Sequence, residues 1–166
     1  MLVAGIATAV WVRQHNHGNH GHGAHKTPDF DILQAELSKS DGGSTTLAQF
    51  ESEKILLNFW ATWCAPCRHE MPFFDQAAKK LPAVKVVGIT VEDREIVNKF
   101  LQEIPLNYDI FTSKFDIFYY FQLNGNKTGI LPFTVLIDKE GRLLAKKIGE
   151  FPDTESIVAF AQKSET

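Results

Sequence analysis

The two cysteines of this chain lie three residues apart, in Trp63-Cys64-Ala65-Pro66-Cys67-Arg68, at the junction of two different segments. The apolar run 55–60 precedes the pair and has the composition of a strand buried on both faces. The stretch 68–81 follows it and is compatible with a helix. This arrangement predicts a strand, a turn and a helix whose first turn carries both thiols, a context suited to disulfide exchange.

Length and composition favour one globular domain. The chain has 166 residues, 44% of them hydrophobic, which suffices for a sizeable core. Its net charge of -3 comes from interspersed charges of both signs, so we expect no nucleic-acid partner. Two cysteines cannot staple a small fold, and they supply only half of the four ligands that a structural zinc site usually needs.

The N-terminal segment differs in composition from the rest of the chain. Residues 2–12 are uncharged and apolar, over a length typical of the apolar region of a signal peptide rather than of a membrane-spanning helix. We interpret residues 1–12 as a vestige of an export signal or membrane anchor; an amphipathic or disordered leader is the alternative. Residues 13–28 are rich in His, Gly and Asn and predict a flexible tether. The folded domain is expected to comprise residues 29–166.

The tether contains a histidine tract that suggests a metal site. Imidazoles at this density can bind Cu(II), Ni(II) or Zn(II) loosely. A soluble spacer that happens to be rich in histidine explains the composition equally well. The candidate ligands are His15, His17, His20, His22 and His25.

Hydrophobic periodicity and turn residues predict an α/β fold. Residues 30–50 contain strand-like patches separated by Asp41-Gly42-Gly43, which predicts an N-terminal hairpin. The predicted order after it is strand 55–60, helix 64–81, strand 84–91, helix 94–103, helix 114–122, strand 133–137, strand 142–148 and a final helix capped by Asp153 or Thr154. We expect a right-handed crossover between the first two of these strands and an antiparallel hairpin from the last two.

The positions of the two thiols assign them different roles. Residues three apart on a helix lie on one side, so the two sulfur atoms can bond. Unpaired N–H groups and the helix dipole favour a thiolate here and lower the thiol pKa below its usual value of about 8.5. We expect Cys64 to be the more exposed, attacking thiol and Cys67 to resolve the mixed disulfide. The alternatives are half a metal site and two unconnected thiols.

Motifs around the pair resemble those of the thioredoxin superfamily. The match consists of residues 59–67 and of Pro72, five residues after the second cysteine. More narrowly, residues 58–64 (NFWATWC) and 68–72 (RHEMP) resemble the exported, membrane-tethered TlpA/ResA-like thiol-disulfide oxidoreductases. The resemblance covers roughly residues 29–162 and implies a thioredoxin fold, with a central mixed sheet flanked by helices. It also implies a bacterial reductase outside the cytoplasm, often one that serves cytochrome c maturation.

The resemblance further implies a substrate groove. Residues 129–134 (GILPFT) match the segment in which superfamily members have a cis proline that packs against the active-site pair. In this role Pro132 leaves the backbone of Leu131 free to pair with an extended substrate and bars metal ions from the thiols; a trans proline at a strand start is the alternative. Trp63 and Pro66 are expected to complete the groove. A proline before the second cysteine is typical of reductases among related sequences.

Asn58 departs from the pattern of thioredoxins, which have a buried aspartate there to handle the proton of the resolving cysteine. An amide cannot titrate, and Glu70, one helical turn beyond Cys67, is the nearest replacement. In the resembled group a glutamate at this position lies near the pair and tunes its acidity. A carboxylate that is half-buried beside a thiolate has a raised pKa, which suits it to carry a proton. The alternative is a glutamate that faces solvent.

These observations predict an extracytoplasmic, membrane-anchored enzyme that reduces protein disulfides. Its catalytic residues are Cys64, Cys67 and Glu70, and it needs no bound cofactor. The expected partners are a protein disulfide, such as that of apocytochrome c, and a membrane-bound electron donor that reduces the pair again. The alternatives are a copper-handling metallochaperone, which would use the thiols and the histidine tract, and a thiol peroxidase. Ala61 stands where peroxiredoxins usually have a threonine.

Overall fold

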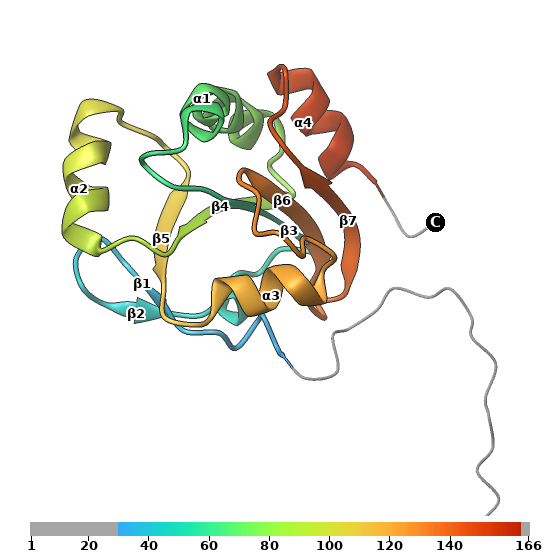
Figure 1. Cartoon of the computed structure of the whole chain (residues 1–166). Helices are drawn as coiled ribbons and strands as arrows, with labels where there is room; N and C mark the ends of the chain where they lie inside the picture. Colours follow the sequence, from blue (N-terminus) through green and yellow to red (C-terminus); the bar gives the residue numbers. More distant parts are fainter. Residues whose placement is uncertain (1–29, 164–166) are drawn as a thin grey trace, which may run out of the picture.

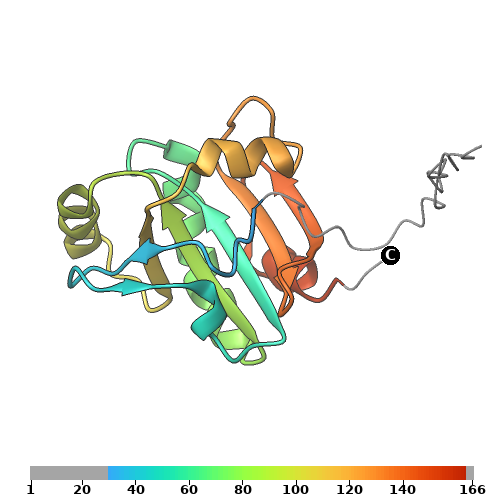
Figure 2. The ribbon, with the colours of Figure 1, turned by 90° about the horizontal axis from the view of Figure 1, so that it is seen from below.

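The computed structural model describes residues 30–163, so the predicted leader (1–12) and histidine-rich tether (13–28) lie outside the described residues. A mixed sheet of seven strands, in the order β2-β1-β5-β4-β3-β6-β7, is flanked by helices (Figures 1 and 2). The strands are β1 (Leu37–Ser38), β2 (Ser44–Thr45), β3 (Lys54–Phe59), β4 (Val84–Thr90), β5 (Asp109–Ser113), β6 (Phe133–Asp138) and β7 (Leu143–Ile148). The helices are α1 (Ala65–Lys80), α2 (Arg94–Glu103), α3 (Ile117–Leu123) and α4 (Thr154–Ala161), with a short 3-10 helix at Leu47–Gln49.

The predicted fold class is confirmed, including the parts of the topology that carry the cysteine motif. Strands β3 and β4 are parallel and are connected by α1. Strands β6 and β7 form the predicted antiparallel hairpin, and β1 and β2 form the N-terminal one. Asp153 caps α4 through its side chain, which accepts a hydrogen bond from the Ser156 N–H at 2.7 Å. No helix within residues 30–163 has the length and apolar character needed to cross a membrane.

Strand β5 corrects the predicted order, which placed two helices in succession after residue 94. Residues 109–113 (DIFTS) pair in parallel with β4 and antiparallel with β1. This strand is short and polar at both ends, so its pattern alone does not separate it from a loop. The helix predicted from residue 114 begins at Ile117, where the Asp116 side chain accepts the Tyr119 N–H. On α2, Val97 is buried, whereas Ile96 beside it is 49% exposed.

The two faces of the sheet carry separate apolar layers. Along β3, Ile55, Leu57 and Phe59 pack on the side of α3. Leu56, between them, packs on the opposite side, together with residues of α1 and α4. Figure 1 shows α1 and α4 above the sheet and α3 below it. Because side chains alternate along a strand, Asn58 faces the same side as Leu56, under the helix that bears the cysteines.

The register places Asn58 in a row of side chains that crosses the sheet. Asn58 pairs with Gly88 on β4 and with Thr134 on β6. Gly88 in turn pairs with Ile110 on β5, and Thr134 with Lys147 on β7. This row carries polar groups at its centre, whereas the neighbouring row contains Leu56. The polar row is therefore the part of the sheet that can meet a polar side chain from α1.

Helix α1 covers this row with a continuous buried face. Cys67, Glu70, Met71, Phe74 and Ala77 are buried, and most of them are three or four residues apart. Three- and four-residue intervals bring side chains to one face of a helix. The helix therefore brings both the resolving cysteine and the glutamate onto the inner side, one turn apart.

Candidate active site

Cys64 and Cys67 form a disulfide at the start of α1, with an S–S distance of 2.03 Å. Cys64 is the N-cap of the helix, and its sulfur accepts the Cys67 N–H at 3.3 Å. Pro66 lies in the first turn, where the missing N–H of proline leaves no helical bond unmade. Cys64 is 5% exposed and Cys67 is fully buried, so Cys64 is the more accessible sulfur, as predicted.

Glu70 is fully buried, which excludes the alternative of a solvent-facing glutamate. Its Oε1 accepts a hydrogen bond from Asn58 Nδ2 at 2.8 Å, and its Oε2 accepts the Phe151 N–H at 2.8 Å. Burial raises the pKa of Glu70 to about 7, although these two hydrogen bonds and the charge of Lys147 act in the opposite direction. A carboxylate with this pKa exchanges its proton near neutral pH, as a general acid or base requires.

The Leu131–Pro132 peptide bond is cis, as the resemblance implies. Leu131 packs against the apolar cluster that contains both cysteines. The backbone of Leu131 makes no hydrogen bond within residues 30–163. Pro132 is buried, and its carbonyl accepts the Gly149 N–H at 2.9 Å. The backbone of Leu131, two residues before β6 and next to the cysteine cluster, is thus left unpaired in the described part of the chain.

The loop between β7 and α4 connects this segment to α1. Gly149 bonds the Pro132 carbonyl, and two residues later the Phe151 N–H bonds Glu70. Glu150, between them, pairs with His69 at 3.3 Å. The His69 side chain is exposed. The loop therefore contacts both the proline segment and two consecutive residues of the helix.

Glu92 is a site residue that sequence reasoning missed. Its Oε1 accepts the Thr62 hydroxyl at 2.7 Å, and its Oε2 accepts the Thr62 N–H. These two hydrogen bonds fix the turn that carries Trp63 and Cys64. Trp63 is 72% exposed. The position of Glu92, two residues beyond the end of β4, is the signal that could have identified it, because functional groups gather at the carboxyl ends of parallel strands.

Two further residues around Glu70 were also missed. Thr134 stands in the quoted motif but had no assigned role, and it bonds Asn58. The Phe151 N–H is a backbone donor from a segment 81 residues away, for which the sequence offers no signal. The predicted residues Cys64, Cys67 and Glu70 are brought together on one helix.

Metal binding by the histidine tract lies outside the described residues and remains a hypothesis. Within residues 30–163, no group of three or more His, Cys, Asp or Glu side chains is arranged to hold a metal ion.

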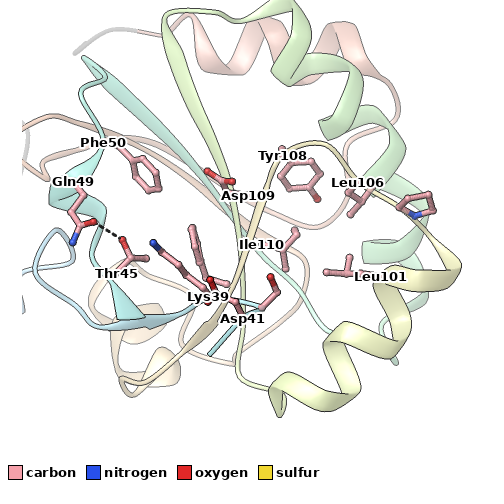
Figure 3. A pocket seen from close by; sticks show the side chains of 13 residues that line it. Lys39, Asp41, Thr45, Gln49, Phe50, Leu101, Leu106, Tyr108, Asp109 and Ile110 are labelled. Carbon is pink, nitrogen blue, oxygen red and sulfur yellow. Dashed lines mark hydrogen bonds between the residues drawn. The ribbon is translucent and has the colours of Figure 1, made fainter. Parts of the chain in front are cut away.

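A pocket of about 610 Å³ lies between the β1–β2 hairpin, the end of α2 and β5 (Figure 3). None of its lining residues is a predicted site residue. Three of them, Leu101, Leu106 and Ile110, also pack against the apolar cluster that holds both cysteines.

A cysteine pair at the start of a helix, beside a cis proline and over a mixed sheet, defines a thioredoxin-fold thiol-disulfide oxidoreductase. The comparisons with known proteins agree with this class. The chain belongs to the Redoxin family, whose model matches residues 24–161. The predicted superfamily is thereby confirmed.

Individual relatives and solved structures point to the same group. Thiol-disulfide oxidoreductase ResA of Bacillus cereus is 28% identical over 141 residues, which cover 83% of this chain and 76% of the relative. ResA of Geobacillus thermodenitrificans is 33% identical over 124 residues, which cover 73% of this chain and 65% of the relative, just under two thirds of its length. The structure of a thioredoxin-related protein from Neisseria meningitidis serogroup B is similar with a TM-score of 0.66 and 30% identity, covering 76% of this chain and 96% of that one.

Proposed function

We propose that this protein reduces disulfides of other proteins outside the cytoplasm. The observation that carries the proposal is the combination of a helix-capping Cys64, a buried Cys67 and a buried Glu70 one turn beyond it. The first two supply a dithiol, and the third supplies a group that can take up a proton near neutral pH. The first-turn Pro66 supports the direction of reduction, because the resemblance associates it with reductases.

The proposed reaction is a two-step exchange. In the reduced protein, the Cys64 thiolate attacks one sulfur of a substrate disulfide; a Cys64–substrate disulfide forms and the other substrate sulfur leaves as a thiolate. Cys67 then loses its proton to Glu70 and attacks the Cys64 sulfur. The Cys64–Cys67 disulfide forms, the second substrate sulfur leaves, and two electrons have passed to the substrate. A dithiol partner at the membrane returns two electrons to the pair by the same exchange in reverse.

We assign the substrate groove to Trp63, Pro66, Leu131 and Pro132. Trp63 presents an exposed aromatic surface beside Cys64. The unpaired backbone of Leu131 can accept an extended segment as an added strand, a common mode of peptide recognition. Such a segment would pass beside the accessible sulfur.

The proposal also names a protein substrate, an electron donor and a cellular location. The similarity to ResA proteins supports a substrate such as apocytochrome c, whose Cys-x-x-Cys-His segment must be reduced before haem attaches. The apolar residues 2–12 support export and attachment to a membrane. The electron donor would then be a membrane-bound dithiol protein.

The test is to trap the covalent intermediate. The Cys67→Ser variant cannot resolve a mixed disulfide, so it should accumulate on its substrates when it is expressed in cells, and mass spectrometry identifies what is bound. The Cys64→Ser variant keeps the buried thiol and serves as the matched control. Recovery of dithiothreitol-sensitive adducts with Cys67→Ser and not with Cys64→Ser is the expected result. Equal adducts for both variants, or none for either, would refute the assigned roles.

A further inference from the structure

Asn58 lies directly under Glu70 and uses both amide hydrogens. Its Nδ2 donates to Glu70 Oε1 at 2.8 Å and to Thr134 Oγ1 at 3.1 Å. The sheet register sets this arrangement, because Asn58 and Thr134 are directly paired across β3 and β6. All three side chains are fully buried, so solvent does not compete for these bonds.

The other end of the amide makes no such contacts. Asn58 Oδ1 is buried and has no hydrogen-bond partner within residues 30–163. A buried acceptor without a partner destabilises the fold, and an apolar side chain of the same size would avoid this penalty. The sheet therefore retains an amide at a position where packing alone favours leucine. What the amide provides is its contact with Glu70.

An amide can serve both protonation states of a carboxyl group. With Glu70 ionised, the Asn58 NH2 group donates to it, as the structure shows. With Glu70 protonated on Oε1, rotation of the amide by half a turn brings Asn58 Oδ1 to accept the new O–H. The Thr134 hydroxyl can follow, because it donates as well as accepts. Leucine can do neither, and aspartate can do both only by changing its own protonation state.

Other charged groups that face Glu70 come from the surrounding elements. Lys147 of β7 lowers its pKa, and Glu150 of the β7–α4 loop, which pairs with His69, raises it. The buried Tyr108 hydroxyl precedes β5 and is itself affected by the charge of Glu70. On its own helix, Glu70 follows Cys67. Asn58 is distinguished from these groups by its direct hydrogen bond to a carboxylate oxygen.

We propose that Asn58 is a positioning residue, which holds the Glu70 carboxyl group over the sheet and sets the pH at which it gains and loses its proton. The inference rests on the proposed function, since it assigns the proton transfer of that reaction to Glu70. Asn58 acts through Glu70 and not by contact with the sulfur atoms. Its effect on thiol chemistry should therefore vanish when Glu70 cannot ionise.

The test follows the Glu70 carboxyl carbon by NMR in the full-length protein labelled with 13C at glutamate side chains, with Glu70→Gln identifying the signal. In Asn58→Leu both protonation states of Glu70 lose a hydrogen bond, and the bond to the ionised carboxylate is the stronger of the two, so the midpoint should rise by about one pH unit. Asn58→Asp places a second carboxyl group at the same position, so the titration should become biphasic with its upper midpoint raised. Asn58→Ala is the smaller replacement if leucine prevents folding.

A second readout is the pH dependence of Cys64 alkylation in the reduced protein. Asn58→Leu should move this profile, and Asn58→Leu with Glu70→Gln should match Glu70→Gln alone. Asn124→Leu is the matched control, because it removes another buried amide, one bonded to the Tyr120 carbonyl. An unchanged Glu70 midpoint in a folded Asn58 variant would overturn the inference. An unchanged alkylation profile in Glu70→Gln would instead remove Glu70 from the proposed reaction and leave the effect of Asn58 on the Glu70 titration intact.

Discussion

The position of Glu70 on the helix could be predicted from the sequence, but its complete burial and its hydrogen-bond partners could not. Its spacing from Cys67 predicts a position one turn along the helix, and this is what the structure has. Its complete burial depends on the Asn58 row beneath it and on the Phe151 N–H from the other end of the chain. Neither contact follows from local pattern, because the partners lie on other elements, 12 and 81 residues from Glu70.

The buried carboxyl group makes stability depend on pH. Burial raises the pKa of Glu70 from 4.5 to about 7, so the folded state holds this proton more tightly than the unfolded state. The resulting stabilisation is complete below about pH 4.5 and is lost as the pH rises through 7, a total of about 3 kcal/mol. Glu70→Gln cannot ionise, so its free energy of unfolding should decrease less than that of the wild type between about pH 4 and pH 8.

Urea unfolding of the oxidised proteins across this range measures the difference. Glu103→Gln, which changes an exposed carboxylate on α2, is the control and should follow the wild-type curve. Parallel curves for Glu70→Gln and the wild type would show that the folded state does not raise the pKa of Glu70.

At the level of elements, the long periodic segments were predictable and the short ones were not. The run 84–91 contains almost only apolar residues, and α2 was predicted with its observed bounds, Arg94–Glu103. Strand β5 was missed because it depends on pairing with β4 and β1. Gly88 explains part of this pairing, since it lies beside Ile110 and leaves space for it.

Substitution of this glycine tests how closely β4 and β5 are packed. In Gly88→Ala, the added Cβ would lie 2.5 Å from Ile110 Cδ1 and 3.1 Å from Trp60 Nε1. We expect a loss of about 1–3 kcal/mol of stability, as for other overpacked cores. Ile110→Val removes Cδ1, so the double variant should recover most of the loss, which urea unfolding can measure. Additive losses in the double variant would contradict this explanation.

Across the whole molecule, the site lies at the ends of β3 and β4 from which α1 and Glu92 emerge. Functional groups of α/β folds gather at this edge, so the fold class and the cysteine motif together located the site. The partners of the site residues could not be predicted, because strand register and the β7–α4 loop place them. Exposed apolar side chains also occur at this edge. Among them are Trp63, which directly precedes Cys64, and Ile130, two residues before the cis proline.

The exposed aromatic surface predicts a distinction between large and small substrates. Trp63 is 72% exposed, so Trp63→Ala should leave stability nearly unchanged. Its loss should lower kcat/KM for a protein disulfide such as insulin about tenfold, because a protein can contact the indole ring. A small aromatic disulfide reaches Cys64 without that contact and should react at close to the wild-type rate. Equal losses for both substrates would assign Trp63 to the chemistry of Cys64 rather than to recognition.

The sulfur of Cys64 is also the N-cap of α1, and this double use has a consequence for the reaction cycle. A thiolate, a mixed disulfide and the Cys64–Cys67 disulfide all leave lone pairs on that sulfur. The Cys67 N–H therefore keeps an acceptor while the covalent partner of the sulfur changes. The first turn of α1 does not have to unwind and reform at each exchange. The fold can therefore stay the same while disulfides form and break at Cys64.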